Sequence, residues 1–549
     1  MNKTCSYCNT VFEITDKEKV MYEKIDLVIP DICVQCRWKQ HMAFWPFGKF
    51  RTGTSDLSGE RLITVLPENA RYPIYTSKEW WGDDWDAMDY GQDYDSSRSF
   101  FDQLKELQEK VPRPHQQGAQ NVDCDWCDDP WESKNCYLSR SILRAENLLY
   151  GYRAVDVKDS IDISHVFTLD QCYDCGYCFS SYNLLFSRNC RDCIDSSFLF
   201  DCRNCSNCFM SWNLRGKSYC IENVQYTKET YFEKMKTINF GSYEELQKFK
   251  IQYTEILKNK AVHKENFNIK TYGSIGTYMT NCNNCTNVFC WEDSENCVNC
   301  LRGLKAKDCI DMTGCWKIEV SGNNSCSTNA YELKYSIWCD GARYSEYCDQ
   351  CLEIDYCFGC VSLRKKKYCI LNKQYTKEEY EALKEKIIAD MKARGEYGQF
   401  PLYSLGLCPY NFSTAVIYFP EVTKKYVEER GGYWEEIIDK KIEGMQTSEL
   451  PDSITEVDSS ISKQALICPV TGWRYNIADA ELAFLKNKNI ALPRVHFDVR
   501  TKERLMSMSQ TKSEAYTCTY CSKEVMAYYP KNWGYERIAC EECYLKEIA

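Results

Sequence analysis

Eight cysteines lie in pairs near the two ends of the chain, at the spacing of metal ligands. The pairs are Cys5-x2-Cys8 with Cys33-x2-Cys36, and Cys518-x2-Cys521 with Cys540-x2-Cys543. Two thiolates separated by two residues can bind one ion, and two such pairs complete the tetrahedral four-thiolate site that zinc prefers. Four protein ligands leave no position for water or substrate, so each set predicts a structural zinc ribbon. We expect at least two structural Zn²⁺ ions.

Twenty-six further cysteines lie between residues 124 and 369. Serine, leucine and valine occur at the same spacing, which favours small core residues over metal ligands because a metal site would not tolerate the exchange. Additional zinc and iron–sulfur clusters are the alternatives. The pairs that open the two cysteine-rich regions are the candidates for additional metal: Cys124, Cys127, Cys282 and Cys285.

The sequence carries no recognisable catalytic signature. It lacks a glycine-rich phosphate loop, GxSxG and HExxH. Of its five histidines, His165, His263 and His496 are the ones to test, and none has a nucleophile or carboxylate at a telling spacing. We therefore predict no catalytic residue and expect no enzymatic activity.

Charge places a limit on the partners of the chain. A formal net charge of -11 argues against a general nucleic-acid coat, although local basic patches can still bind nucleic acid. The candidate interaction residues are Arg37, Trp38 and Lys39 beside the first ribbon, and Lys365, Lys366 and Lys367. For the first three, packing onto a neighbouring segment is the alternative that we favour.

A repeat of six residues positions the cysteines between the ribbons. Small or apolar residues recur at every sixth position from Cys136 to Cys220 and from Cys285 to Cys369, and mostly at the third position between. Six fits neither a helix nor simple strand alternation, but it fits short strands joined by tight corners in a parallel β-solenoid. Asn and Asp often precede the inward position, as expected for turns. Cysteine spacings allow a flat coil of 12 residues or a three-sided coil of 18.

The repeat occurs twice. Leu214–Ile221 matches Leu363–Ile370, and Gln225–Glu229 matches Gln374–Glu378, at a constant shift of 149 residues. This is a tandem duplication. Each copy ends in a predicted helix, opened by Thr227 or by a capping box of Thr376 with Glu379, which would cap the open edge of the sheet.

The predicted fold is mainly β with helical caps: a duplicated parallel β-solenoid of six-residue repeats, flanked by N- and C-terminal four-cysteine zinc ribbons. The segments are a zinc ribbon (1–45), an aromatic and acidic linking segment (46–123), the first solenoid half (124–226), a helical insert (227–272), the second half (273–375), a helical cap and connecting region (376–444), a linker (445–465), a small α/β segment (466–511) and a second zinc ribbon (512–549).

Several strings resemble one known family. They are 213–229 and its copy at 362–378, Trp80–Phe101, Val111–Pro114, Leu492–Arg494 and Cys540–Glu547. Together they resemble cysteine-rich zinc-ribbon proteins with duplicated cysteine repeats from reduced-genome bacteria and giant viruses. The resemblance covers most of the chain. It implies bound zinc but no established activity, and so no catalytic residues.

These features predict a non-catalytic zinc-binding scaffold that docks a protein or ribonucleoprotein assembly. One alternative is an RNA- or ribosome-associated factor. Another is a solenoid enzyme, either acyltransferase-like or an iron–sulfur redox protein. The N-terminus has no apolar signal core and no stretch of 18 apolar residues follows. We therefore expect a cytoplasmic or otherwise intracellular protein (in a virion if viral), which is not secreted and has no membrane partner.

Overall fold

The computed structural model describes residues 1–314, 317–436, 443–508 and 510–548. It divides into two compact units that each combine distant parts of the sequence. Unit 1 holds residues 1–116 and 266–436, and unit 2 holds residues 117–265 and the described residues after 442. Each unit is mainly β and contains one copy of the repeat. None of the helices in the described ranges has the length and apolar character needed to span a bilayer.

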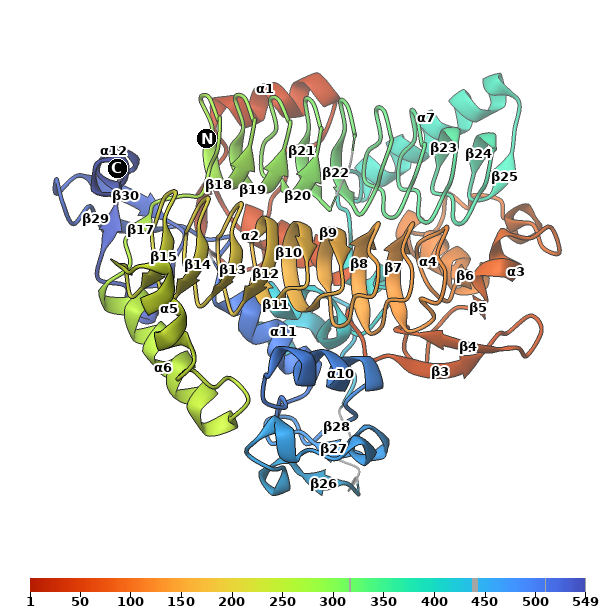
Figure 1. Ribbon diagram of the computed structural model, residues 1–549. Helices are drawn as coiled ribbons and strands as arrows, with labels where there is room; N and C mark the ends of the chain where they lie inside the picture. The colour runs from red at the N-terminus through yellow and green to blue at the C-terminus, as the bar shows by residue number, and fades with distance from the viewer. Residues whose placement is uncertain (315–316, 437–442, 509, 549) are drawn as a thin grey trace. The chain divides into compact units, whose positions relative to one another are not determined.

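The first repeat region, residues 117–226 of unit 2, forms a ten-stranded sheet whose strands follow each other in chain order (Figure 1). All neighbours are parallel except the last pair, and each residue pairs with the residue 12 positions further on, as Cys208 does with Cys220. Isolated bridges between the strands keep the same offset, for example Val122 with Lys134. The strands are β7 (Cys127–Trp131), β8 (Ser139–Leu143), β9 (Tyr152–Lys158), β10 (Ile161–Asp170), β11 (Tyr173–Gly176), β12 (Phe179–Leu185), β13 (Ile194–Ser197), β14 (Ser206–Phe209), β15 (Ser218–Ile221) and β16 (Val224–Gln225).

The second repeat region, residues 266–375 of unit 1, has the same register. Its parallel pairs are also offset by 12, after a shift between Ile275 and Gly276. Of the two coil lengths that the sequence allowed, the pairing has 12. The strands are β18 (Ile275–Thr280), β19 (Thr286–Glu292), β20 (Leu301–Leu304), β21 (Ile310–Thr313), β22 (Gly322–Ser325), β23 (Asp355–Phe358), β24 (Lys367–Ile370) and β25 (Lys373–Gln374).

A left-handed backbone conformation recurs at almost every third residue of both regions. Asn135, Leu138 and Ser141, for example, have φ of 59°, 47° and 53°. Asn and Asp tolerate this conformation best among residues with a side chain, which explains their frequency just before the inward position. Their amides also bond along the stack: Asn147 donates to Asp159 (2.7 Å), and Asn296, at the matching position 149 residues later, donates to Asp308 (2.9 Å).

The interior of the first repeat region is a continuous stack of buried small and apolar side chains, 12 of them cysteines. Cysteine and serine make the same contacts there. Cys193 Sγ donates to the carbonyl of Arg191 (3.3 Å), and Ser181 Oγ donates to that of Phe179 (2.8 Å). Ser181 Oγ also accepts from the amide of Cys193, which lies 12 residues further on (3.1 Å). The thiols therefore serve as small core groups that satisfy backbone carbonyls.

The remaining elements surround the repeat regions. In unit 1 they are β1 (Asn2–Thr4), β2 (Val11–Glu13), α1 (Asp16–Ile25), α2 (Val34–Ala43), β3 (Arg51–Thr54), β4 (Arg61–Thr64), β5 (Ile74–Tyr75), α3 (Ser77–Trp81), α4 (Phe100–Lys110), β6 (Arg113–Pro114), α7 (Lys377–Ala393), α8 (Ala415–Tyr418) and α9 (Lys424–Glu428). In unit 2 they are α5 (Lys228–Met235), α6 (Tyr243–Asn259), β17 (His263–Lys264), β26 (Met445–Gln446), β27 (Leu466–Ile467), β28 (Arg474–Tyr475), α10 (Asp479–Lys488), α11 (Phe497–Met506), β29 (Glu514–Thr517), β30 (Glu524–Ala527), β31 (Ile538–Ala539) and α12 (Glu541–Glu547). Short 3-10 turns are Ala87–Tyr90, Tyr403–Leu405, Tyr410–Phe412, Thr447–Glu449, Ile454–Glu456, Ser459–Lys463 and Lys531–Trp533.

Two features outside the repeats agree with sequence predictions. Helix α7 begins with the capping box of Thr376 and Glu379 and packs on β24, while α5 packs on β15. The aromatic segment packs within unit 1, since Trp80 and Phe100 are buried and Phe100 meets Phe358 at 5.2 Å between ring centroids.

Candidate metal centres

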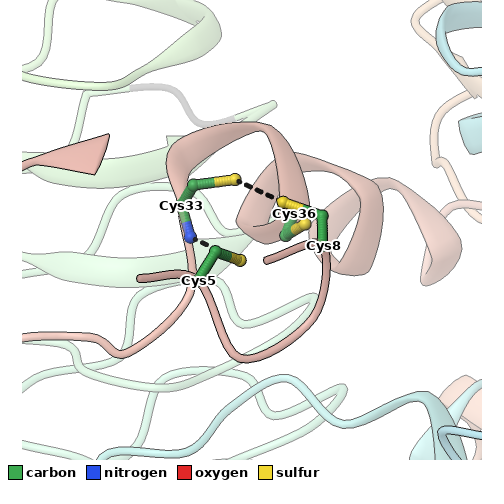
Figure 2. A group of neighbouring side chains, drawn as sticks. All are labelled: Cys5, Cys8, Cys33 and Cys36. Carbon is green, nitrogen blue, oxygen red and sulfur yellow. Dashed lines mark hydrogen bonds between the residues drawn. The ribbon is translucent and has the colours of Figure 1, made fainter. Parts of the chain in front are cut away.

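The four cysteines near the N-terminus converge on one point. The sulfur atoms of Cys5, Cys8, Cys33 and Cys36 all lie within 4.8 Å of one another. Figure 2 shows the two pairs facing each other, one from the hairpin of β1 and β2 and one from the start of α2. The Cys33 amide donates to the Cys5 sulfur (3.2 Å), and the sulfurs of Cys8 and Cys33 are 3.7 Å apart. Four thiols in this arrangement could hold a metal ion with no ligand position left open.

A second group near the C-terminus repeats this arrangement in unit 2. The sulfur atoms of Cys518, Cys521, Cys540 and Cys543 also lie within 4.8 Å of one another. The Cys540 amide donates to the Cys518 sulfur (3.4 Å), and the sulfurs of Cys521 and Cys540 are 3.7 Å apart. Both predicted ligand sets are therefore brought together.

The thiols in these groups are prepared for deprotonation. The pKa of Cys33 is lowered to about 5, chiefly by a hydrogen bond from the Cys36 thiol that outweighs burial. Burial raises the pKa of Cys518, but the amides of Cys540, Cys521 and Tyr520 lower it further, to about 6. Metals bind the thiolate form, so these environments favour ligation near neutral pH.

A specific turn presents the first cysteine pair in each group. The amide of Cys5 donates to the carbonyl five residues on, Thr10, and the amide of Asn9 donates back to the Cys5 carbonyl, both at 2.9 Å. The corresponding bonds join Cys518 with Lys523 and Ser522. The residue four positions after the cysteine is left-handed in both, with φ of 58° at Asn9 and 60° at Ser522. The second pair begins at a helix N-cap, Cys33 or Cys540.

The segment 466–506 of unit 2 has the architecture of the first ribbon without its four ligands. The turn bonds recur at Cys468, Gly472 and Trp473, with Gly472 left-handed (φ 68°). Two ten-residue helices follow, and His496 is the N-cap of the second. At a constant shift of 463 residues, the ligands Cys5, Cys8, Cys33 and Cys36 correspond to Cys468, Thr471, His496 and Val499.

The contacts of these two segments with their repeat regions also correspond. Arg37 forms a buried ion pair with Asp311 (2.9 Å). Its counterpart Arg500 pairs with Asp162 (3.2 Å), the residue 149 positions before Asp311. The same holds for His41, which bonds Thr313 and Asn323, and for Arg504, which contacts Ser164 and Asp174. Segment 466–506 is thus the structural counterpart of the N-terminal ribbon.

Segment 51–81 of unit 1 is likewise the counterpart of the C-terminal ribbon. Its hairpin of β3 and β4 has the same turn at Ser55, and the amide of Asp56 donates to the carbonyl of Ile74 as that of Thr519 does to Ile538 (2.9 Å each). The positions of the four cysteines are taken by Ser55, Ser58, Thr76 and Glu79. Ser55 and Thr76 donate to one Glu79 oxygen at 2.5 and 2.9 Å. Hydrogen bonds to a carboxylate take the place of thiolates here.

The unoccupied ligand positions follow a pattern. Each unit contains one repeat region, one segment of each ribbon type, and one four-cysteine group. Unit 1 keeps the cysteines in the first type of segment, and unit 2 keeps them in the second. Because the shift of 463 runs through Asp16 and Asp479, Pro30 and Pro493, and Arg37 and Arg500, the sequence did carry this signal. It was missed because the cysteines themselves are lost.

The other candidate ligands lie in the repeat interiors. Among the described residues, the two terminal groups are the only sets of three or more candidate ligands close enough to share one ion. Cys124 and Cys127 are buried in the stack of the first repeat region, and Cys282 and Cys285 are buried in the second. Cys282 and Cys285 donate to carbonyls two residues earlier, at 3.4 Å each, as other core thiols do.

The candidate interaction residues have different environments. Arg37 and Trp38 are buried against the second repeat region, and Trp38 donates its indole N–H to the Asn299 carbonyl (3.1 Å). Lys39 pairs with Glu421 (2.8 Å). These placements agree with packing inside the unit. Lys365 and Lys367 are exposed, and Lys366 pairs with Asp86 (3.4 Å).

The histidines named as catalytic candidates are held in packed environments. His263 stacks on Tyr535 (3.7 Å between centroids), and burial lowers its pKa to about 4. His165 stacks on Tyr177 at 4.9 Å. His496 caps α11 by accepting the amide of Asp498 (3.1 Å). Each has a structural contact that explains its presence.

Comparisons with known proteins do not assign this chain to a family. No family model matches it, and no curated protein matches it. One solved structure with partial similarity is a UDP-N-acetylglucosamine acyltransferase from Campylobacter jejuni, at 8% identity over 58% of this chain and 94% of that chain, with a TM-score of 0.08. A similarity this weak supports no conclusion about fold or activity.

Proposed function

We propose that the protein is a non-catalytic scaffold in which two equivalent solenoid units are each fixed by one structural zinc ion. The observation that carries this proposal is the coordination geometry: each four-cysteine group supplies a full set of thiolate ligands beside a helix that packs on the repeat region. A site of this kind stabilises a fold and leaves no position for substrate. Zinc fits four thiolates better than the harder divalent ions do.

The pairing supports a two-sided β-solenoid with 12 residues per coil. Parallel pairs at an offset of 12 occur within the named strands and also at the bridges between them, which is the pattern of a chain that turns twice per coil. A stack of such coils presents long rows of surface side chains at regular spacing. Rows of this kind suit docking to a protein or ribonucleoprotein assembly.

The resemblance to cysteine-rich zinc-ribbon proteins of reduced-genome bacteria and giant viruses is part of the same proposal, as is an intracellular location. Reduced thiols buried throughout both repeat regions are compatible with such a compartment. An RNA- or ribosome-associated role is the second candidate, and the exposed cations Lys365 and Lys367 favour it over an enzyme.

The test is affinity purification of the full chain from its native lysate, with quantitative mass spectrometry of bound proteins and RNA. A scaffold predicts a reproducible assembly at near-stoichiometric amounts. A variant with Cys8→Ser and Cys521→Ser is the comparison, and it should lose that assembly because both ribbons loosen. A chain that purifies alone and turns over an acyl donor would contradict the proposal.

A further inference from the structure

A shallow hollow of about 650 Å³ lies on the surface of the second repeat region. It is lined by two rows of residues spaced by 12, Gly341, Glu353 and Lys365 in one and Arg343, Asp355 and Lys367 in the other. Gly341 has no side chain, which leaves space between the longer side chains of the rows. The hollow therefore follows directly from the 12-residue register.

The hollow is positive on a chain that is negative overall. Its lining includes four cations, with Lys366 as the fourth, against the carboxylates of Glu353 and Asp355. Arg343 pairs with Asp355 (3.1 Å), and Lys366 pairs with Asp86. Lys365 and Lys367 form no ion pair within the described residues, so two exposed ammonium groups remain uncompensated.

A column of tyrosines follows the residues of the second row. Tyr344 and Tyr356 stack at 4.8 Å between centroids, and Tyr356 and Tyr368 at 5.4 Å. The Lys367 ammonium lies 5.4 Å from the Tyr356 ring and 5.0 Å from the Tyr368 ring. Tyr344, at one end of the column, is 37% exposed. Aromatic rings beside a cationic groove are the elements that bind single-stranded nucleic acid.

The duplication provides an internal comparison for this surface. In the first repeat region the positions of the hollow carry Asp192, Ile194, Asn204, Ser206, Gly216 and Ser218. Tyr344 and Tyr356 correspond to Asp195 and Asn207. The inward positions keep small or apolar residues in both copies, while this outward face gains cations and rings in only one. Maintenance of the coil does not require these residues, because the other copy lacks them.

We propose that this hollow binds single-stranded RNA, with the cations of Arg343, Lys365 and Lys367 against phosphates and the tyrosine column beside the bases. The size of the hollow suits a short stretch of nucleotides, and a duplex would hide the base faces that aromatic rings contact. The site stands independently of the scaffold role, because it requires no protein partner.

The experiment measures fluorescence anisotropy of the full chain with a labelled oligouridylate of about ten nucleotides, from about 50 to 200 mM salt. The test variant is Lys365→Glu with Lys367→Glu. The control is Lys158→Glu with Lys217→Glu, which makes the same change of charge on exposed lysines of the first repeat region. Zinc content and thermal unfolding of both variants show whether they fold.

We expect the test variant to lose at least about tenfold in affinity, and its plot of log K against log salt to be less steep by about 1.4. Tyr344→Ala should weaken binding by about tenfold at constant charge. The control should bind like the wild type. Equal losses in test and control would overturn the site, and so would an affinity unchanged by Tyr344→Ala with full displacement by inorganic polyphosphate, which would indicate a general polyanion contact.

Discussion

The two kinds of ribbon segment solve the same structural problem in different ways. In the four-cysteine groups, the hairpin turn and the helix N-cap meet through thiols that could share one ion. In segment 51–81 they meet through hydrogen bonds of Ser55 and Thr76 to Glu79, and in segment 466–506 only Cys468 and His496 remain at the ligand positions. The backbone turns and the contacts with the repeat region are kept in all cases. The fold of the segment therefore does not require metal wherever packing and hydrogen bonds suffice.

The largest expected effect separates ligand cysteines from core cysteines. Cys33→Ser should abolish metal binding in unit 1 and lower the free energy of unfolding by more than about 5 kcal/mol, because metal binding is coupled to folding of the ribbon. Cys193→Ser should cost about 1 kcal/mol or less, because serine makes the same bonds at neighbouring coils. Chemical unfolding of both variants measures the difference. Equal losses would mean that the repeat thiols also bind metal.

The buried arginines test whether the two counterparts are held in the same way. Arg37→Ala and Arg500→Ala each leave a buried aspartate without its partner, Asp311 or Asp162. We expect each to cost about 3–5 kcal/mol in thermal unfolding. Lys39→Ala is the matched control in α2, and it should cost less than about 1 kcal/mol because its partner Glu421 is mostly exposed. A negligible effect at Arg500 would contradict the correspondence of the segments.

Restoring ligands should restore a metal site. Thr471→Cys with Val499→Cys gives a set of three cysteines and His496 at the positions of Cys5, Cys8, Cys33 and Cys36. We expect this variant to bind one additional Zn²⁺ and to gain about 2.7 kcal/mol at a free zinc concentration 100 times its Kd. Native mass spectrometry counts the ions. Thr471→Ser with Val499→Ala, which adds no thiol, serves as control and should bind no additional ion.

Acid should weaken segment 51–81 through Glu79. Burial raises its pKa, but hydrogen bonds from Ser55, Ser58 and Thr76 lower it further, to about 2 from an ordinary value of 4.5. Because the folded pKa lies below the unfolded one, the stabilisation is present above about pH 4.5 and is lost as the pH falls toward 2. We expect a loss of about 1–2 kcal/mol, reduced by partial exposure. Hydrogen exchange of β3 and β4, corrected for intrinsic rates, measures it, and Glu79→Gln should flatten the pH dependence.

Much of this organisation is visible in the sequence because cysteine is conspicuous. The pairs at both ends predicted their groups, and the shift of 149 predicted two equivalent repeat regions. The coil length was left open because inward residues recur every third position, and multiples of three such as 12 and 18 both fit. The backbone explains that spacing: a left-handed residue precedes almost every inward one.

The counterpart segments were harder to predict for a physical reason. A hairpin turn depends on backbone hydrogen bonds and one left-handed residue, which Asn9, Ser522 and Gly472 all provide. Sequence identity is not needed once the metal is gone. The surviving signals are the residues that contact the repeat region, such as Arg37 and Arg500, and their meaning depends on aspartates hundreds of residues away.

The most direct test is a count of metal ions in the intact protein and in two single variants. Native mass spectrometry with elemental analysis should find two Zn²⁺ ions in the wild type, and one each in Cys33→Ser and Cys540→Ser, because each unit holds one four-cysteine group. Absence of zinc from the wild type, more than two ions, or a coloured iron-containing protein would contradict the account.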